Sequence, residues 1–418
     1  MTDEWHTAPL GEITQFINGL WKGEDPPFVH VGVIRNTNFT KDGALDDSDI
    51  AYLEVETKKF QKRRLQFGDV ILEKSGGGPK QPVGRVVLFD KTEGHFSFSN
   101  FTAAIRVVDP TALDSRFLHK YLHWVYVSGR TETMQSHSTG IRNLNGDAYK
   151  AIEVTYPSLH EQRRIVAFLD EAFEAIATAK ANAEKNLQNA RKLFQVQRDA
   201  VFAAGRESWS SQPLGAIAEV QSGGTPPVST KAFWGGDIPW YSSGELNSMK
   251  TRDPERLITE AGLAGSNAKL FPTGSLLIGM YDTAALKMSI ADRPAAFNQA
   301  IAGVKPNPKV SMEFLLHAIN FRKPELLDLR RGVRQKNLSL GKIKEFMVPV
   351  PGPQVQVEIV RQLRTSQELS HRLNTVYERK LAALDELKHS LLRQAFTGGL
   401  SQSNDRPPQA RGLQMCTQ

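Results

Sequence analysis

The chain has 418 residues, which is too long for one ordinary domain and fits two or three. Apolar residues make up 40% and charged residues 23%, so hydrophobic cores of normal size can form. Lysine and arginine number 52 against 45 aspartates and glutamates, and the net charge of +7 is compatible with binding a polyanion. The one cysteine excludes a disulfide within the chain and a cysteine-based zinc site.

The composition indicates a protein of the reducing cytoplasm that has no contact with a membrane. The N-terminus carries acidic residues and a histidine and lacks the apolar core of a signal peptide. No stretch approaches the roughly 18 apolar residues of a membrane span. The histidines show no spacing typical of metal ligands, and we expect no metal site. His119 and His123 stand four residues apart in an expected helix, which is more typical of packing than of a ligand site.

The pattern over residues 1–158 is typical of a mixed α/β domain. Short β-rich runs, such as Val70–Leu72 and Gly84–Leu88, are separated by glycine, proline and polar loops. A helical stretch follows at Ser115–Val127. We therefore expect a first domain of the α/β (α+β) class.

A long helix is predicted over residues 159–205. Leu159–Ala204 contains neither proline nor glycine and is bracketed by Pro157 and Gly205, the usual punctuation of a helix. At 1.5 Å per residue it would be roughly 65–70 Å long. Steps of three and four residues give it a coiled-coil seam. The seam consists of Val166, Leu169, Phe173, Ile176, Lys180, Ala183, Leu187, Ala190, Phe194, Gln197 and Val201.

The same order of elements then returns. Residues 206–353 again predict a mixed α/β domain, with a β-rich run at Leu276–Met280 and a helical stretch at Met312–Asn320. A second long helix is expected over residues 354–399, because Gln354–Thr397 lacks proline and glycine. Residues 400–418 are expected to form a disordered tail.

We expect the two long helices to pair as an antiparallel coiled coil. The alternative, two separate surface helices each packed on its own domain, is disfavoured because ordinary globular helices rarely run this long. The second seam is more polar, and an apolar surplus on its other side is assigned to partner proteins. The second seam is Val360, Leu363, Gln367, Ser370, Asn374, Tyr377, Leu381, Leu384, Lys388, Leu391 and Ala395, and the surplus is Leu369, Leu373, Val376, Ala383 and Leu387.

These features form an internal duplication with a pseudo-twofold character. Matches within the globular parts drift in offset from 192 to 206 residues, whereas matches in and beside the helices keep an offset of 194. Many matches in the same order are strong evidence of a repeat. A constant helix length between variable loops suggests a spacer. The matched pairs include Pro9–Ile13 with Pro213–Ile217, Gly68–Leu72 with Gly274–Ile278, Gly140–Arg142 with Gly332–Arg334, Pro157 with Pro351, Gln162 with Gln356, and Phe202 with Phe396.

One motif suggests catalysis. Asp25–Pro26–Pro27–Phe28 matches the signature with which amino-methyltransferases hold a flipped base. However, no convincing glycine-rich motif for S-adenosylmethionine accompanies it. The second copy keeps only the prolines, Pro226 and Pro227, between Thr225 and Val228. We interpret both segments as structural turns.

Candidate nucleic-acid contacts fall in corresponding loops of the two copies. Arginine, asparagine and glutamine suit base edges, whereas lysine and hydroxyl residues suit phosphates. The glycine-rich run Ser75–Lys80 lacks the Gly-Lys-Ser/Thr of a nucleotide P-loop and suits a loop near a DNA backbone or a surface hairpin. For each candidate the plainer alternative is a solvated basic turn. The candidates are Lys22, Lys74, Lys80, Arg142 and Asn143 in the first copy, and Tyr281, Arg331, Arg334, Gln335, Lys336 and Asn337 in the second.

In order and duplication, the motifs resemble the specificity subunit of type I restriction–modification systems. The resemblance runs from about Trp5 to Leu400. It is carried by Tyr156–Gln162 with Arg164–Val166, Ser222–Pro226, Gly236–Trp240 and Phe271–Leu277.

The resemblance implies two target recognition domains, each reading one half of a split double-stranded DNA sequence, with the paired helices between them. It implies that the chain itself is not catalytic and carries no cofactor. Two modification subunits would supply S-adenosylmethionine and methylate adenine N6, and one or two restriction subunits would cleave DNA with ATP and Mg²⁺. Two alternatives remain: a self-contained DNA methyltransferase using Asp25–Phe28, and a coiled-coil adaptor without DNA contact.

Overall fold

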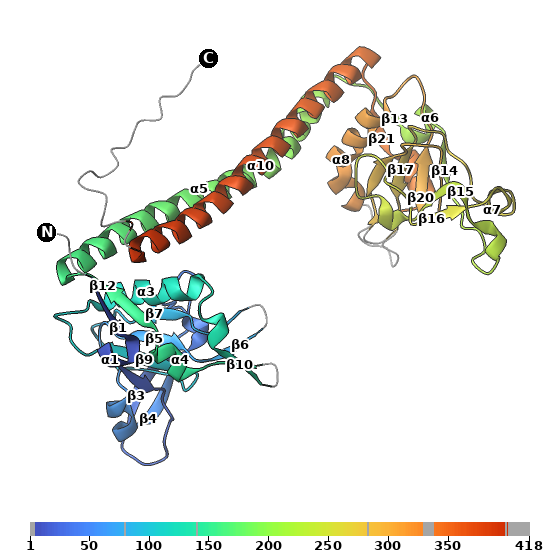
Figure 1. Ribbon diagram of the computed structural model, residues 1–418. Coiled ribbons are helices and arrows are strands. Elements are labelled where there is room, and N and C mark those ends of the chain that lie inside the picture. The colour runs from blue at the N-terminus through green and yellow to red at the C-terminus, as the bar shows by residue number, and fades with distance from the viewer. Residues whose placement is uncertain are drawn as a thin grey trace, which may run out of the picture. The chain divides into compact units, whose positions relative to one another are not determined.

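The computed structural model describes residues 5–78, 81–138, 141–281, 284–328, 338–397 and 399. The chain divides into two units, residues 1–184 with 379–418, and residues 185–378. The division falls inside both long helices, so each unit holds one globular domain and a part of each helix (Figure 1). The expected tail, residues 400–418, lies outside the described residues.

The first domain has a central antiparallel sheet in the order β2-β9-β5-β7, an outer sheet β4-β3-β8, a small sheet β10-β11-β6 and the pair β1-β12. Its strands are β1 (His6–Pro9), β2 (Thr14–Asn18), β3 (Phe28–Ile34), β4 (Ala51–Glu56), β5 (Val70–Glu73), β6 (Ser75–Gly77), β7 (Val86–Leu88), β8 (Phe96–Phe98), β9 (Thr102–Val107), β10 (Gln135–Ser138), β11 (Ile141–Leu144) and β12 (Glu153–Tyr156). Its helices are α1 (Leu10–Ile13), α2 (Thr57–Lys62), α3 (Ser115–Val127) and α4 (Gly146–Lys150), with 3-10 turns η1 (Asn36–Asn38) and η2 (Glu132–Met134).

Strand β5 shows why this domain forms layers. Its residues are all apolar from Val70 to Leu72, as expected of a strand covered on both faces. Val70 and Leu72 pack with α3 in one core cluster, and Ile71 packs with residues of the outer sheet in another. The central sheet is therefore enclosed between a helical layer and a second sheet.

The second domain repeats this topology, which confirms the predicted duplication. Its central sheet has the order β14-β20-β17-β18, its outer sheet β16-β15-β19, and its terminal pair β13-β21. The strands are β13 (Ser211–Pro213), β14 (Val220–Ser222), β15 (Trp234–Tyr241), β16 (Arg256–Ile258), β17 (Leu276–Gly279), β18 (Met288–Ile290), β19 (Ala296–Phe297), β20 (Ile301–Val304) and β21 (Met347–Pro349). The helices are α6 (Leu214–Ile217), α7 (Glu260–Ala264), α8 (Met312–Asp328) and α9 (Leu340–Glu345), with 3-10 turns η3 (Lys231–Phe233) and η4 (Ser243–Glu245).

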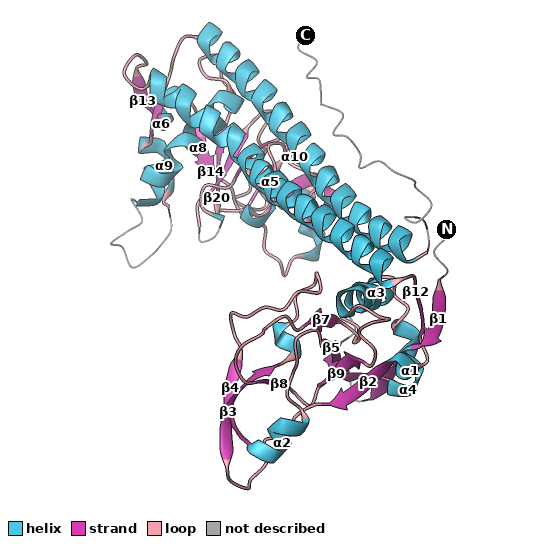
Figure 2. Ribbon diagram, turned by 90° about the vertical axis from the view of Figure 1, so that its left-hand side faces the viewer, coloured by secondary structure: helices cyan, strands magenta, loops and turns pink. Residues whose placement is uncertain are grey.

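The two long helices, α5 (Leu159–Gly205) and α10 (Pro353–Phe396), pair antiparallel. In the first unit Lys180 Nζ donates to Asp385 Oδ1 at 2.6 Å. In the second unit Ser370 Oγ donates to the carbonyl oxygen of Ala190 at 2.6 Å. The two helices lie side by side in both views (Figure 2). The coiled coil is thus confirmed, and the alternative of two unpaired surface helices is wrong.

The predicted seam holds with two corrections. Leu169, Ile176, Leu187 and Leu363 are buried, and the other interface candidates are partly buried: Phe173, Phe194, Leu373, Tyr377, Leu384 and Leu391. Gln367 is exposed, because the buried stripe runs from Leu363 through Ser366 to Ser370. Gln197 is also exposed. At that end of α5 the buried side chain is Phe202, which packs in the core of the second domain.

Each domain core takes in parts of both helices. The core of the first domain includes Ile165 and Leu169 near the start of α5, and Phe396 at the end of α10. The core of the second includes Phe202 near the end of α5, and Leu363 near the start of α10. The helices are therefore continuous with the cores rather than attached to them by linkers.

A buried glutamine fixes the first turn of each long helix. Gln162 Nε2 donates to the carbonyls of Ala112 and Pro157 at 2.8 and 2.9 Å, and Gln162 Oε1 accepts from the amide of Asp114 at 2.8 Å. Gln356 repeats this arrangement in the second domain. Its Nε2 donates to Lys309 O and Pro351 O, and its Oε1 accepts from Ser311 N. Each amide satisfies three backbone groups that would otherwise be unpaired.

We predict that Gln162→Leu lowers the free energy of unfolding of the first domain by about 3 kcal/mol, because it leaves buried backbone donors and acceptors without hydrogen-bond partners. Urea unfolding followed by limited proteolysis would measure the loss. Gln367→Leu is the control, since Gln367 is exposed on α10. Equal stability of the two variants would contradict this role for the glutamine.

Candidate nucleic-acid interface

The fold brings two of the predicted loops of the first domain together. Strand β11 lies between β10 and β6, with Arg142 opposite Gly77 and Asn143 opposite Ser75. The amide of Leu144 donates to Lys74 O at 2.8 Å, and the Ser75 hydroxyl donates to Asn143 Oδ1 at 2.5 Å. These strands lie at one side of the domain (Figure 1). We call this surface, built from Lys74–Gly78, Gln135–Ser138 and Ile141–Leu144, the β6–β11 face.

The β6–β11 face presents cationic and amide groups. Lys74 Nζ donates to Asn18 Oδ1 at 3.0 Å, and partial burial lowers the pKa of Lys74. Arg142 Nη1 lies 3.4 Å from Gln135 Oε1. Arg142 and Asn143 are partly exposed. Such donors can bind phosphates and base edges, so the face suits a nucleic acid.

Two other candidates of the first domain are placed differently. Lys22 is exposed, but its carbonyl accepts from the amide of Glu56, so its backbone joins the outer sheet at the end of β4. It therefore belongs to another part of the surface. Lys80 lies outside the described residues.

The second domain has the corresponding backbone contact. The amide of Leu338 donates to Met280 O at 2.9 Å, matching the bond from Leu144 to Lys74. Tyr281 therefore stands beside the returning chain, but it is partly buried against the domain core and is less available than predicted. Arg331, Arg334, Gln335, Lys336 and Asn337 lie outside the described residues.

Asn18 and Gln135, and the pairing of Ser75 with Asn143, were missed in the sequence analysis. Asn18, Ser75 and Gln135 accept or donate the hydrogen bonds of Lys74, Asn143 and Arg142. Asn18 is 56 residues from Lys74, and Ser75 is 68 residues from Asn143. No local pattern indicates pairs so far apart.

The Asp25–Phe28 segment is a surface turn. All four residues are exposed. The carbonyl of Pro27 accepts from the amide and the hydroxyl of Thr57 at 2.9 and 2.8 Å, which ties the turn to the start of α2. In the second domain the carbonyl of Pro227 accepts from the indole of Trp234 at 3.3 Å. An exposed carboxylate and ring do not form the enclosed pocket that a flipped base requires.

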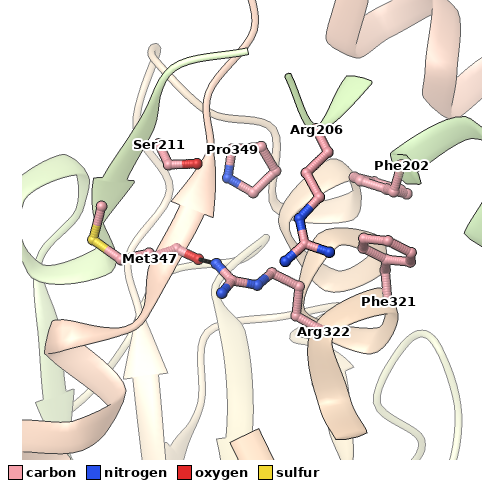
Figure 3. Close-up of a pocket in the computed structure, with 7 residues that line it drawn as sticks. All are labelled: Phe202, Arg206, Ser211, Phe321, Arg322, Met347 and Pro349. Atoms are coloured by element: carbon pink, nitrogen blue, oxygen red, sulfur yellow. Dashed lines mark hydrogen bonds between the residues drawn. The ribbon is translucent and has the colours of Figure 1, made fainter. Parts of the chain in front are cut away.

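A cavity of about 300 Å³ in the second domain is shown in Figure 3. The side chains of Arg206 and Arg322 point into it, and Arg322 also donates to Met347 O. The lining holds no carboxylate or histidine that could activate the hydroxyl of Ser211, so it lacks the parts of a nucleophilic site. Its full lining is Phe202, Arg206, Ser211, Phe321, Arg322, Met347 and Pro349.

His119 and His123 are a packed pair. Their rings stack 6.3 Å apart between centroids, and His119 Nε2 lies 2.9 Å from Gly43 O. Burial lowers the pKa of His119 to about 4 and that of His123 to about 3. Within the described part of the chain no cluster of three potential metal ligands occurs, and no helix there is long and apolar enough to cross a membrane.

Comparisons with known proteins agree on one family. The family model described as Type I restriction modification DNA specificity domain matches residues 2–188 and 206–378. The type I restriction enzyme EcoR124I/EcoR124II specificity subunit of Escherichia coli is 27% identical over 300 residues, covering 68% of this chain and 72% of that protein. The EcoKI specificity subunit of Escherichia coli strain K12 is 22% identical over 445 residues, covering 96% and 90%.

A solved structure agrees on the fold. The HsdS subunit from Thermoanaerobacter tengcongensis superposes with a TM-score of 0.69 at 18% identity, covering 94% of this chain and 97% of that one.

The histidine pair predicts acid sensitivity of the first domain. The unfolded chain binds protons at these rings below about pH 6.5, whereas the folded chain does so only near pH 4 and pH 3. Stability therefore falls as pH drops from about 6.5 toward 4, by up to about 1.4 kcal/mol per pH unit for each ring. Melting temperatures between pH 7.5 and 5 would show it. His123→Leu should flatten this dependence, whereas exposed His371→Leu should not; identical slopes in both variants would refute the assignment.

Proposed function

Because the chain belongs to the type I restriction–modification DNA specificity family, we propose that each of its domains reads one half of a split, asymmetric DNA site. The observation that carries this proposal is a shared backbone with different side chains. An equivalent amide-to-carbonyl bond links the two candidate loops in each domain, from Leu144 to Lys74 in the first and from Leu338 to Met280 in the second. The surrounding residues differ between the copies, so the two half-sites should differ.

We propose that the coiled coil acts as a spacer between the two readers. Each helix starts in one core and ends in the other. The number of helical residues between the cores would then set the distance between half-sites. DNA turns once per roughly 34–36 Å, so helices of this length could separate two major-groove contacts by more than one turn.

The catalytic steps are assigned to partners. Two modification subunits would carry S-adenosylmethionine and methylate adenine N6, and one or two restriction subunits would use ATP and Mg²⁺, all in the cytoplasm. An apolar stripe on α10 supports docking of partners, because Leu369, Val376 and Leu387 are 50%, 56% and 46% exposed. The relatives are specificity subunits by name, which supports a chain without catalysis of its own.

Arginine variants in the two matched loops test the proposal. In the assembled complex we expect Arg142→Ala to relax one half-site and Arg334→Ala to relax the other, each by about 1–3 kcal/mol if the guanidinium binds a base edge. Methylation of DNA libraries randomised in one half-site at a time would measure this.

Asp25→Ala is the control, because it alters only an exposed turn and should leave methylation intact. Loss of turnover in Asp25→Ala with retained DNA binding would favour the methyltransferase alternative. Relaxation of both half-sites by either arginine variant would contradict one reader per domain.

Shortening the coiled coil tests the spacer. Removing one heptad from each helix, Ala181–Leu187 and the facing Glu378–Leu384, keeps the seam in register. The loss of about 10 Å of helix should shorten the gap between half-sites by about three base pairs. Sequencing of methylated host DNA would show the new spacing. An unchanged gap would refute a spacer role.

A further inference from the structure

The first domain contains a buried ion pair directly before the Lys74–Gly78 segment of the β6–β11 face. Glu73, the last residue of β5, is 1% exposed. Arg85 Nε donates to Glu73 Oε2 and Arg85 Nη2 donates to Glu73 Oε1, both at 2.8 Å. A bidentate pair of this kind fixes the orientation of both side chains.

The same guanidinium reaches the segment that follows β3. Arg85 Nη1 donates to Phe39 O at 2.9 Å, and Nη2 donates to Asn36 O at 3.1 Å. Asn36 Nδ2 lies 3.4 Å from Glu73 Oε1. A Cβ added to Gly76, which has a φ of +103°, would lie 2.7 Å from Asn36 Nδ2. The network therefore joins β5, the residue before β7 and the chain after β3, next to the Lys74–Gly78 segment that contains β6.

The second domain shows that the backbone does not need this pair. Gly279 takes the place of Glu73, and its amide donates to Lys287 O at 2.9 Å, as the amide of Glu73 does to Arg85 O. The amide of Leu286 donates to Gly279 O, as that of Gly84 does to Glu73 O. The backbone bonds that join the end of β5 to the start of β7 are thus matched between β17 and β18 without a carboxylate.

We propose that Glu73 and Arg85 are positioning residues for DNA recognition by the first domain, holding Lys74 and Ser75 where they meet β11. The inference rests on the proposed function of the two domains. It assigns specificity to a pair that acts through its neighbours, because the side chain of Glu73 is 1% exposed and that of Arg85 is 12% exposed. It also explains why an ion pair that the fold can do without is present in one copy and replaced by glycine in the other.

The other end of β5 supplies a matched control. Asp69 is equally buried and receives a bidentate pair of bonds from Arg106, at 2.8 and 2.7 Å. Asp69 precedes β5 and Arg106 lies in β9, and among the bonds of the described residues neither contacts the Lys74–Gly78 segment. It shares the chemistry and burial of the Glu73–Arg85 pair but not its location.

The test compares Glu73→Gln/Arg85→Met with Asp69→Asn/Arg106→Met in the assembled complex. Both double variants remove a buried ion pair as a unit, which limits the damage from an unpaired charge. DNA libraries randomised in one half-site at a time would give the discrimination and the KM and kcat of methylation, alongside melting temperatures. We expect only the first variant to lose discrimination, by about tenfold and in one half-site alone, the order that one base contact supplies.

Unchanged discrimination in the Glu73→Gln/Arg85→Met complex would overturn the inference. Equal loss in the Asp69→Asn/Arg106→Met complex would also overturn it, because general destabilisation would then explain the effect. Failure of the proposed function would look different, since the wild-type complex would discriminate in neither half-site.

Discussion

The buried glutamine at the base of each long helix is the constraint on which the arrangement of this protein depends. Gln162 and Gln356 each bind three backbone groups of the preceding domain, and each is almost inaccessible to solvent. A buried amide with all its partners fixed allows little change in the direction of the helix. The helix therefore begins as part of the domain core, and its seam residues continue that core into the coiled coil.

The two domains resemble each other in their backbone and differ in the side chains of their candidate loops. The two domains share the strand order of their central and outer sheets, the amide-to-carbonyl bond between their candidate loops, and the backbone bonds at the end of β5 or β17. The side chains at these positions differ: Lys74 stands where the other copy has Met280, and Glu73 where it has Gly279. A backbone held by its own hydrogen bonds tolerates such exchange, because the fold does not draw its stability from the residues that would meet a ligand.

The positions that were predicted wrongly from the sequence have one cause in common. Gln367 was assigned to the seam by a regular heptad, but the small side chains of Ser366 and Ser370 let α10 approach α5 closely and move the buried stripe by one residue. Tyr281 was expected at a surface and instead packs partly into the core. In each case a contact distant in the chain decided the outcome.

The amino-acid sequence by itself determined the duplication, the two long helices, most of their seam and the mixed α/β class of the domains. These follow from periodicities and from glycine and proline positions, which act within a few residues. Only the tertiary structure decided that β6 and β11 meet, that Asn18 binds Lys74, and that Glu73 and Arg85 form a buried pair. Such contacts depend on how strands far apart in the chain are brought into register, and no local pattern encodes that.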